Sequence, residues 1–130
     1  MDPVVHFEMP YRNRDRMAAF YERVFGWTSN KLGAEMGNYV VMTTATSDVM
    51  RDGHRGAING GFFEYKADWP DQHPSVVISV KDVRAKMKDV QAAGGEVLGE
   101  PMLIPGIGDY VGFRDTEGNR VSMLQPLPRG

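Results

Sequence analysis

The sequence contains no cysteine, which excludes disulfide bonds and thiolate metal sites. It also has no cluster of Lys or Arg, and its formal net charge of −2 gives nucleic-acid binding no electrostatic support. No apolar run approaches the roughly 20 residues of a membrane-spanning helix. The first residues, MDPVVHFEMP, lack the basic and apolar regions of a signal peptide. These absences predict a cytoplasmic protein that binds neither nucleic acid nor membrane.

The composition is that of an ordinary globular protein. The chain has 130 residues, of which 42% are hydrophobic and 25% are charged. This length is enough for one compact domain with its own core. We therefore expect a single domain over residues 1–130.

Two segments of the chain repeat at one fixed offset. Residues 5–27 align without a gap with residues 74–96, shifted by 69 positions. Each copy starts with a strand-like run, passes a helix-capping residue (Asn13 or Asp82) and continues into an amphipathic helix that stops at glycine. A repeat this long with only two copies is not a solenoid. It predicts two βαβββ modules, at 1–66 and 74–126, that share one sheet and meet at a groove.

The elements inside each module follow from periodicity and turn residues. We expect an apolar helix stripe of Ala18, Tyr21, Val24 and Phe25. The adjacent glycines at 60 and 61 predict a bulge or a close approach to the backbone in the fourth strand. Segment 103–109 is expected to be a loop, either a lid or a tight connection. The expected strands are 4–9, 27–31, 39–44, 57–65, 75–80, 96–98, 110–114 and 120–124, and the expected helices are 14–25 and 83–93.

The chain also resembles a known superfamily. Its opening, HFEMPYRNRDRMAAFYERVFGW, and its closing run, FRDTEGNRVSMLQP, resemble the vicinal oxygen chelate superfamily, which includes glyoxalase I, extradiol dioxygenases and bleomycin-resistance proteins. The runs INGGFF and LIPGIGDYVGF are similar to an uncharacterised, glyoxalase-related branch. The resemblance covers nearly the whole chain. It implies an α+β fold in which two βαβββ modules form a cupped, eight-stranded mixed sheet with a helix outside each half.

The resemblance also implies a metal site with one ligand from each of four strands. At the matched positions this chain has His6, Ser75 and Ser122, where metal-dependent members usually have His, His and Glu. The fourth position falls near Ala57 or Asn59. A divalent metal needs about three or four N, O or S ligands. His6 is thus the one strong ligand that is retained at a matched position, although His73 could replace Ser75 by a shift of two residues.

His6 and Glu8 are the candidate catalytic pair. They share one face of the first strand, opposite Phe7 and Met9. One interpretation is a functional pair in which Glu8 raises the pKa of His6, or His6 acts as an acid or a base. The other is a pair of satisfied structural groups. Alternation along the strands predicts the residues that line the groove: His6, Glu8, Asn59, Ser75, Val77, Ser122 and Leu124.

Two functions compete on these grounds. The first is a metal-free protein, without a cofactor, that binds a small organic molecule in the sheet groove. The alternative is a divalent-metal-dependent enzyme with atypical ligands, similar to lactoylglutathione lyase or to a dioxygenase. A third possibility is a subunit that serves protein association. The resemblance further implies a homodimer.

Overall fold

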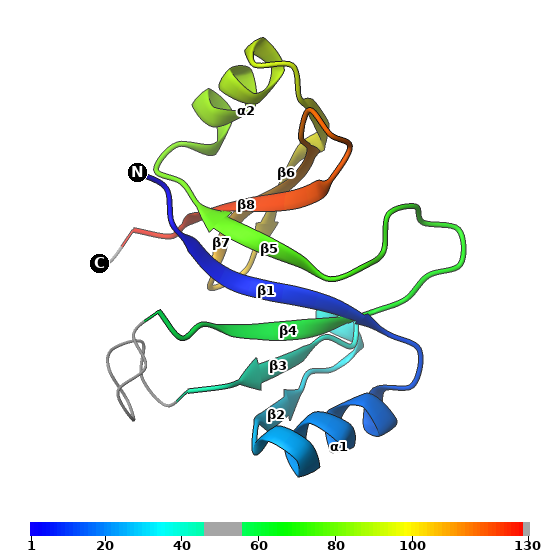
Figure 1. Cartoon of the computed structure of the whole chain (residues 1–130). Coiled ribbons are helices and arrows are strands. Elements are labelled where there is room, and N and C mark those ends of the chain that lie inside the picture. The colour runs from blue at the N-terminus through cyan, green and yellow to red at the C-terminus, as the bar shows by residue number, and fades with distance from the viewer. Residues whose placement is uncertain (46–55, 129–130) are drawn as a thin grey trace. The chain divides into compact units, whose positions relative to one another are not determined.

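The computed structural model describes residues 1–45 and 56–128. Within these residues, eight strands and two α-helices occur in the order expected for two βαβββ modules (Figure 1). The predicted class, α+β with an eight-stranded mixed sheet, is confirmed. The elements are β1 (Val4–Tyr11), α1 (Arg14–Phe25), β2 (Thr28–Lys31), the 3-10 turn η1 (Ala34–Met36), β3 (Val40–Thr43), β4 (Asn59–Glu64), β5 (Ser75–Ser79), α2 (Val83–Ala92), β6 (Glu96–Ile104), β7 (Gly108–Arg114) and β8 (Arg120–Pro126).

The chain divides into two compact units. The first unit is His6–Pro74, and the second unit is Ser75–Gly130 together with Met1–Val5. Strand order in the first unit is β2-β3-β4-β1, and in the second it is β5-β8-β7-β6. Each unit pairs its first strand with its last in parallel, β1 with β4 and β5 with β8, while the other pairs are antiparallel. The two units therefore repeat the same topology.

Capping residues set the ends of both helices. Helix α1 has the predicted bounds, because the Asn13 side chain accepts a hydrogen bond from Arg16 N at 3.0 Å and Gly26 adopts a left-handed φ of 73°. In α2, the Asp82 side chain accepts from Ala85 N at 3.1 Å. This second helix ends at Ala92, and Gly94 rather than Gly95 takes the positive φ, 96°.

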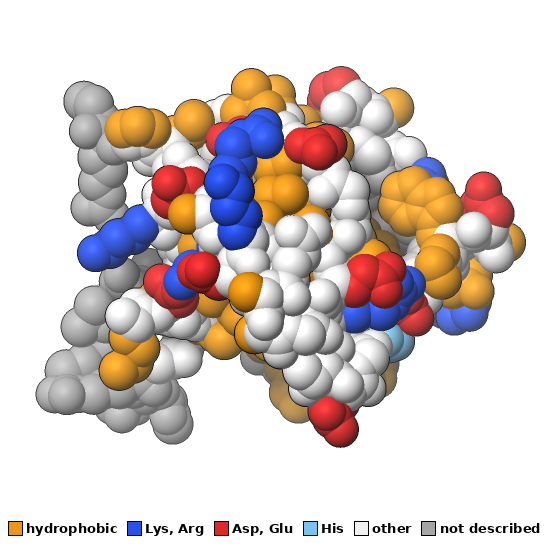
Figure 2. All heavy atoms as spheres, turned by 90° about the horizontal axis from the view of Figure 1, so that it is seen from above, with side chains coloured by type: hydrophobic (Ala, Val, Ile, Leu, Met, Phe, Trp, Pro, Cys, Tyr) orange, Lys and Arg blue, Asp and Glu red, His pale blue; other side chains and the backbone are white. Residues whose placement is uncertain are grey.

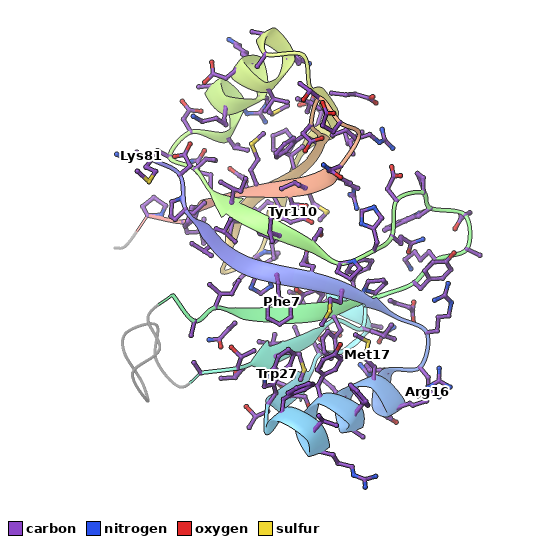
Figure 3. All side chains as sticks on the ribbon, viewed as in Figure 1. Phe7, Arg16, Met17, Trp27, Lys81 and Tyr110 are labelled. Atoms are coloured by element: carbon purple, nitrogen blue, oxygen red, sulfur yellow. The ribbon has the colours of Figure 1, made fainter. Side chains whose placement is uncertain are left out.

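The core of the first unit lies between its sheet and α1. Phe7, Met17 and Trp27 point toward this core in Figure 3. Within α1, Ala18 is buried and Tyr21 packs on the core, as expected. The rest of the predicted stripe is wrong, because Val24 and Phe25 are 57% and 60% exposed. The core residues are Tyr11, Val40, Met42 and Phe62, with Phe7, Met9, Met17, Tyr21 and Trp27 packed against them.

The second unit has a matching core beneath α2. Ile78 on β5 and Met123 on β8 contribute to it, together with Met87 and Val90 from the helix. The buried members are Val80, Val83, Val111 and Met123. In each unit the helix thus covers one face of the sheet. The polar candidate residues occupy the alternate strand positions, whose side chains point to the other face.

Every strand differs from its predicted bounds at one end or both, and β1 and β6 show why. Strand β1 continues past Pro10 to Tyr11, whose carbonyl accepts a hydrogen bond from Tyr65 N at 2.9 Å. Strand β6 is longer than expected because a register shift between Leu98 and Met102 absorbs the irregular residues, and it runs to Ile104. The predicted loop 103–109 is therefore a tight turn at 105–107, which favours the connection over the lid.

The final turn, DTEGN, is organised by Asp115. Its carboxylate accepts hydrogen bonds from Glu117 N, Asn119 N and the Asn119 side chain at 2.9–3.0 Å. These hydrogen bonds lower the pKa of the Asp115 carboxyl, and the one from the Asn119 side chain contributes most. Gly118 adopts a φ of 83°, a left-handed conformation that glycine accommodates without strain.

No one sign of charge dominates the face seen in Figure 2. Figure 2 shows acidic, basic and hydrophobic side chains intermixed on the face in view. Among the described residues, neither helix combines the length and the apolar character that crossing a bilayer requires.

Candidate functional site

Three side chains of the first unit form a hydrogen-bonded chain on the face opposite α1. The Tyr39 hydroxyl lies 2.8 Å from His6 Nε2 and donates to Glu8 Oε2 at 2.9 Å. His6 and Glu8 extend from β1, and Tyr39 immediately precedes β3. The rings of His6 and Tyr39 are nearly parallel, with an interplanar angle of 18°. The predicted polar pair is therefore a triad, bridged by a phenol.

Gly61 makes room for this phenol. A Cβ atom built on Gly61 would lie 2.0 Å from the Tyr39 hydroxyl oxygen and 2.1 Å from Cζ, far inside van der Waals contact. Gly60 has the same role on the opposite face, where a Cβ would lie 2.4 Å from the Phe7 ring. The two glycines thus mark a close approach, one of the two expectations, but the approaching groups are aromatic side chains rather than backbone.

Asn59 contributes mainly to local structure. It pairs with His6 in the β1–β4 register. Its Oδ1 atom accepts hydrogen bonds from Thr44 N at 2.8 Å and Ala45 N at 3.1 Å, which holds the end of β3. Its side-chain oxygen is therefore already engaged, and its role in ligand binding stays a prediction.

Burial lowers the pKa of His6 below its usual 6.5, and the negative charge of Glu8 raises it by less. The net direction is opposite to the expectation that Glu8 would raise it. Since the imidazole desolvation outweighs the neighbouring carboxylate, His6 is neutral at pH 7. A neutral imidazole has one donor and one acceptor nitrogen, and so could serve as a base.

We expect this shift to make the protein less stable in weak acid. A histidine whose pKa is lower in the folded state binds protons preferentially in the unfolded chain. The contribution of His6 to the free energy of unfolding is therefore intact above about pH 6.5. The contribution falls as the pH drops below that value and is lost once the pH has passed the folded-state pKa. Urea unfolding of wild type and His6→Gln between about pH 7.5 and 5 measures this difference.

The variant should lose much of this pH dependence. A matched His73→Gln variant should keep it, because His73 is exposed. Identical slopes for wild type and His6→Gln would show that His6 does not carry the effect.

The corresponding face of the second unit carries serines and a tyrosine instead of a histidine–glutamate pair. Val77 pairs with Ser122, and both are almost completely buried. Leu124 pairs with Ser79 on the same pair of strands. The Ser122 hydroxyl lies 2.6 Å from the hydroxyl of Tyr110, which pairs with Leu124 in the β7–β8 register. Whether all seven predicted residues share one groove stays a prediction.

Arg120 adds a positive charge to the second unit. Its guanidinium lies along Gly112, where Nη2 is 3.0 Å from the position of a Cβ atom. Sequence reasoning gave no reason to single out this arginine, because its position beside Gly112 depends on the strand register.

Tyr39 and Tyr110 occupy equivalent positions in the two units. Glu8 pairs with Gly61, and Val77, 69 residues after Glu8, pairs with Ser122. Gly61 is therefore the counterpart of Ser122. The antiparallel neighbours agree, since Val41 pairs with Gly61 and Gly112 pairs with Ser122. Tyr39 lies two residues before Val41, and Tyr110 lies two residues before Gly112.

This register corrects the expected fourth ligand position. The position near Ala57 or Asn59 falls instead on Gly61, which has no side chain. The other matched positions hold His6, Ser75 and Ser122. Among the described residues, no three His, Asp or Glu side chains gather closely enough to hold a metal ion. The residues present therefore do not fit the divalent metal that the resemblance implies.

His73, the other histidine among the described residues, does not complete the set. His73 is exposed, and its Nδ1 lies 3.4 Å from the Pro74 carbonyl oxygen. His54 lies outside the described residues.

Sequence reasoning missed Tyr39 as a member of the site. The signal was present in the two adjacent glycines, which indicate that a bulky group approaches β4 on each face. Which residue approaches depends on the pairing of β3 with β4, and local sequence signals do not specify that register when residues 44–58 separate the two strands.

Comparison with protein families gives a match over almost the whole chain. The model of the Glyoxalase/Bleomycin resistance protein/Dioxygenase superfamily matches residues 4–123. A protein of Mycobacterium tuberculosis named putative glyoxylase CFP32 is 32% identical over 116 residues, which is 88% of this chain and 41% of the relative. The same protein name and identity are found in Mycobacterium bovis. The chain thus spans less than half the length of these relatives.

Solved structures share the fold. Methylmalonyl-CoA epimerase from Mycobacterium tuberculosis matches with a TM-score of 0.70 at 11% identity, over 96% of this chain and 88% of that chain. The hypothetical protein BH1468 from Bacillus halodurans matches with a TM-score of 0.71 at 10% identity, over 99% and 97% of the two chains. At these identities the likeness extends to the fold alone.

Proposed function

This chain belongs to the Glyoxalase/Bleomycin resistance protein/Dioxygenase superfamily, and on that premise we propose that it binds a small organic molecule without a divalent metal. The binding surface is the side of the first unit's sheet that faces away from α1. His6 and Glu8 supply its polar groups. Its superfamily membership and its glyoxalase-like relative support small-molecule chemistry but do not name the ligand.

One observation carries the metal-free part of this proposal. The Tyr39 phenol takes the space that a side chain at position 61 would need, and its hydroxyl bonds both His6 and Glu8. A metal at this position would have to displace the phenol from His6 Nε2. At the other matched positions the chain has Ser75 and Ser122 instead of an imidazole and a carboxylate, and hydroxyls are weak replacements for those groups.

The polar face suits a ligand with one hydrogen-bonding group and an apolar body. Val41 and Phe63 are half-buried and lie on neighbouring strands. Their side chains point to the same face of the sheet as Glu8. Ligand sites generally combine such apolar walls with a few convergent polar groups. Cytoplasmic location and homodimer formation stay predictions, and superfamily membership supports the dimer.

We expect replacement of His6 or Glu8 by Ala to weaken ligand binding more than it lowers stability. Each change removes one hydrogen bond from the triad, whose net loss is typically about 1 kcal/mol of stability. A ligand held by the same polar group would lose about 1.5–3 kcal/mol, or roughly 10- to 150-fold in affinity, if the contact involves a charge.

The measurement is a small-molecule screen by protein NMR, followed by titration of the best ligand into wild type, both variants and His73→Gln as control. If both variants bind the ligand like wild type and yet lose several kcal/mol of stability, typical of a broken buried network, the pair is structural and the site assignment is wrong.

A further inference from the structure

The two hydrogen bonds of the triad constrain where its protons lie. An ionised Glu8 carboxylate only accepts hydrogen bonds, so the single proton of the Tyr39 phenol goes to Glu8, across 2.9 Å. The phenol oxygen can then only accept from His6, across 2.8 Å. The proton between these two groups therefore belongs to His6 Nε2.

A neutral imidazole carries one proton, and this proton on Nε2 leaves Nδ1 as an acceptor. Within residues 1–45 and 56–128, no hydrogen bond to Nδ1 is found. No buried side-chain nitrogen or oxygen in this part of the chain lacks a hydrogen-bond partner. The Nδ1 atom is thus accessible rather than sealed in the core.

We propose that Tyr39 and Glu8 fix His6 as its Nε2–H tautomer, so that the Nδ1 lone pair accepts a hydrogen bond from a donor group of the ligand. The ligand part of this inference rests on the proposed function. The chemical class that fits is a neutral molecule carrying a hydroxyl or an N–H group. Tyr39 is then a positioning residue, because it acts through His6 and need not touch the ligand.

The tautomer can be measured without any ligand. In ¹⁵N-labelled protein at neutral pH, two-bond ¹H–¹⁵N correlation spectra distinguish protonated from unprotonated ring nitrogens. The chain has three histidines, and His6→Gln identifies the His6 signals by their disappearance. We expect Nε2 of His6 to be protonated and Nδ1 to be unprotonated. The opposite tautomer would overturn the inference.

Two variants test the cause. Tyr39→Phe removes the acceptor for Nε2–H, so the His6 signals should move toward the average of both tautomers. Glu8→Ala removes an acceptor of the phenol proton, which the phenol can then donate to Nε2, so the signals should move toward the Nδ1–H tautomer. Tyr21→Phe is the matched control, because its hydroxyl approaches the Met9 sulfur at 4.0 Å on the helix-covered face. Unchanged His6 signals in Tyr39→Phe or in Glu8→Ala would contradict the assigned roles.

A pair of probes tests the accessible acceptor. Phenol and anisole have similar shapes, but only phenol carries an O–H donor. We expect phenol to shift the Nδ1 resonance of His6 more than anisole does, and an equal shift, or none with phenol, would overturn the donor assignment. In that case the tautomer assignment would still hold. If instead the tautomer test fails, the proposed metal-free ligand binding is still tested separately by the ligand titrations of the His6 and Glu8 variants.

Discussion

Replacing Phe62 by Ala is expected to lower the free energy of unfolding by about 3–5 kcal/mol. The Phe62 ring is fully buried in the core of the first unit, 5.4 Å from the ring of Tyr21 on α1. Removing the ring leaves a cavity among rigid neighbours, which adds to the lost burial energy. Since domains of this size are stable by only about 5–15 kcal/mol, the change is a large fraction of the total.

The adjacent residue provides the control. Phe63 follows Phe62 in β4 but points to the opposite face and is only half-buried. Phe63→Ala should therefore cost much less than Phe62→Ala in the same urea unfolding experiment. Equal losses would contradict the assignment of one face of β4 to the core and the other to the candidate site.

Replacing Gly61 by Ala is expected to lower the free energy of unfolding by about 1–3 kcal/mol, the range for overpacking. The new methyl group would overlap the Tyr39 hydroxyl and ring, which lie 2.0–2.2 Å from its position. The tyrosine must rotate away, and its hydrogen bonds to His6 and Glu8 are lost with it. The same variant should disturb the NMR signals of His6.

The effect should change sign when Tyr39 is also truncated. In a Tyr39→Ala background the space is free, and Ala in a strand interior is favoured over Gly by roughly 0.5–1 kcal/mol. Gly61→Ala should then be neutral or stabilising, and a double-mutant cycle gives the coupling between the two positions. If Gly61→Ala costs the same in both backgrounds, the contact with Tyr39 does not explain the glycine.

Local signals in the sequence were sufficient for the helices and most strand positions. Asn13, Asp82 and Gly26 determine helix ends through hydrogen bonds and backbone conformation within a few residues, which periodicity and capping rules capture. Val24 and Phe25 show where this reasoning fails. Both follow the helical period but are largely exposed, because the period does not specify how much of the helix the core covers.

The site needed information that the sequence does not carry locally. Alternation in β1 correctly separates His6 and Glu8 from Phe7 and Met9, because neighbouring residues of a strand point to opposite faces. The partner that links His6 to Glu8 is the residue just before β3, and its position depends on the pairing of β3 with β4, which is a long-range property. The internal offset of 69 residues also does not extend to the last strand of each unit, where loops of different length intervene, so Gly61 could not be matched to Ser122.

The central claim is that the Tyr39 phenol, rather than a metal, completes the environment of His6. Elemental analysis of the purified, dialysed protein tests it most directly, with Tyr39→Ala analysed in parallel. The account predicts far less than one equivalent of Zn, Ni, Fe or Mn per chain in both proteins, because removing the phenol does not supply the missing ligands. About one tightly held metal ion per wild-type chain would contradict the account and favour a metal-dependent enzyme with atypical ligands.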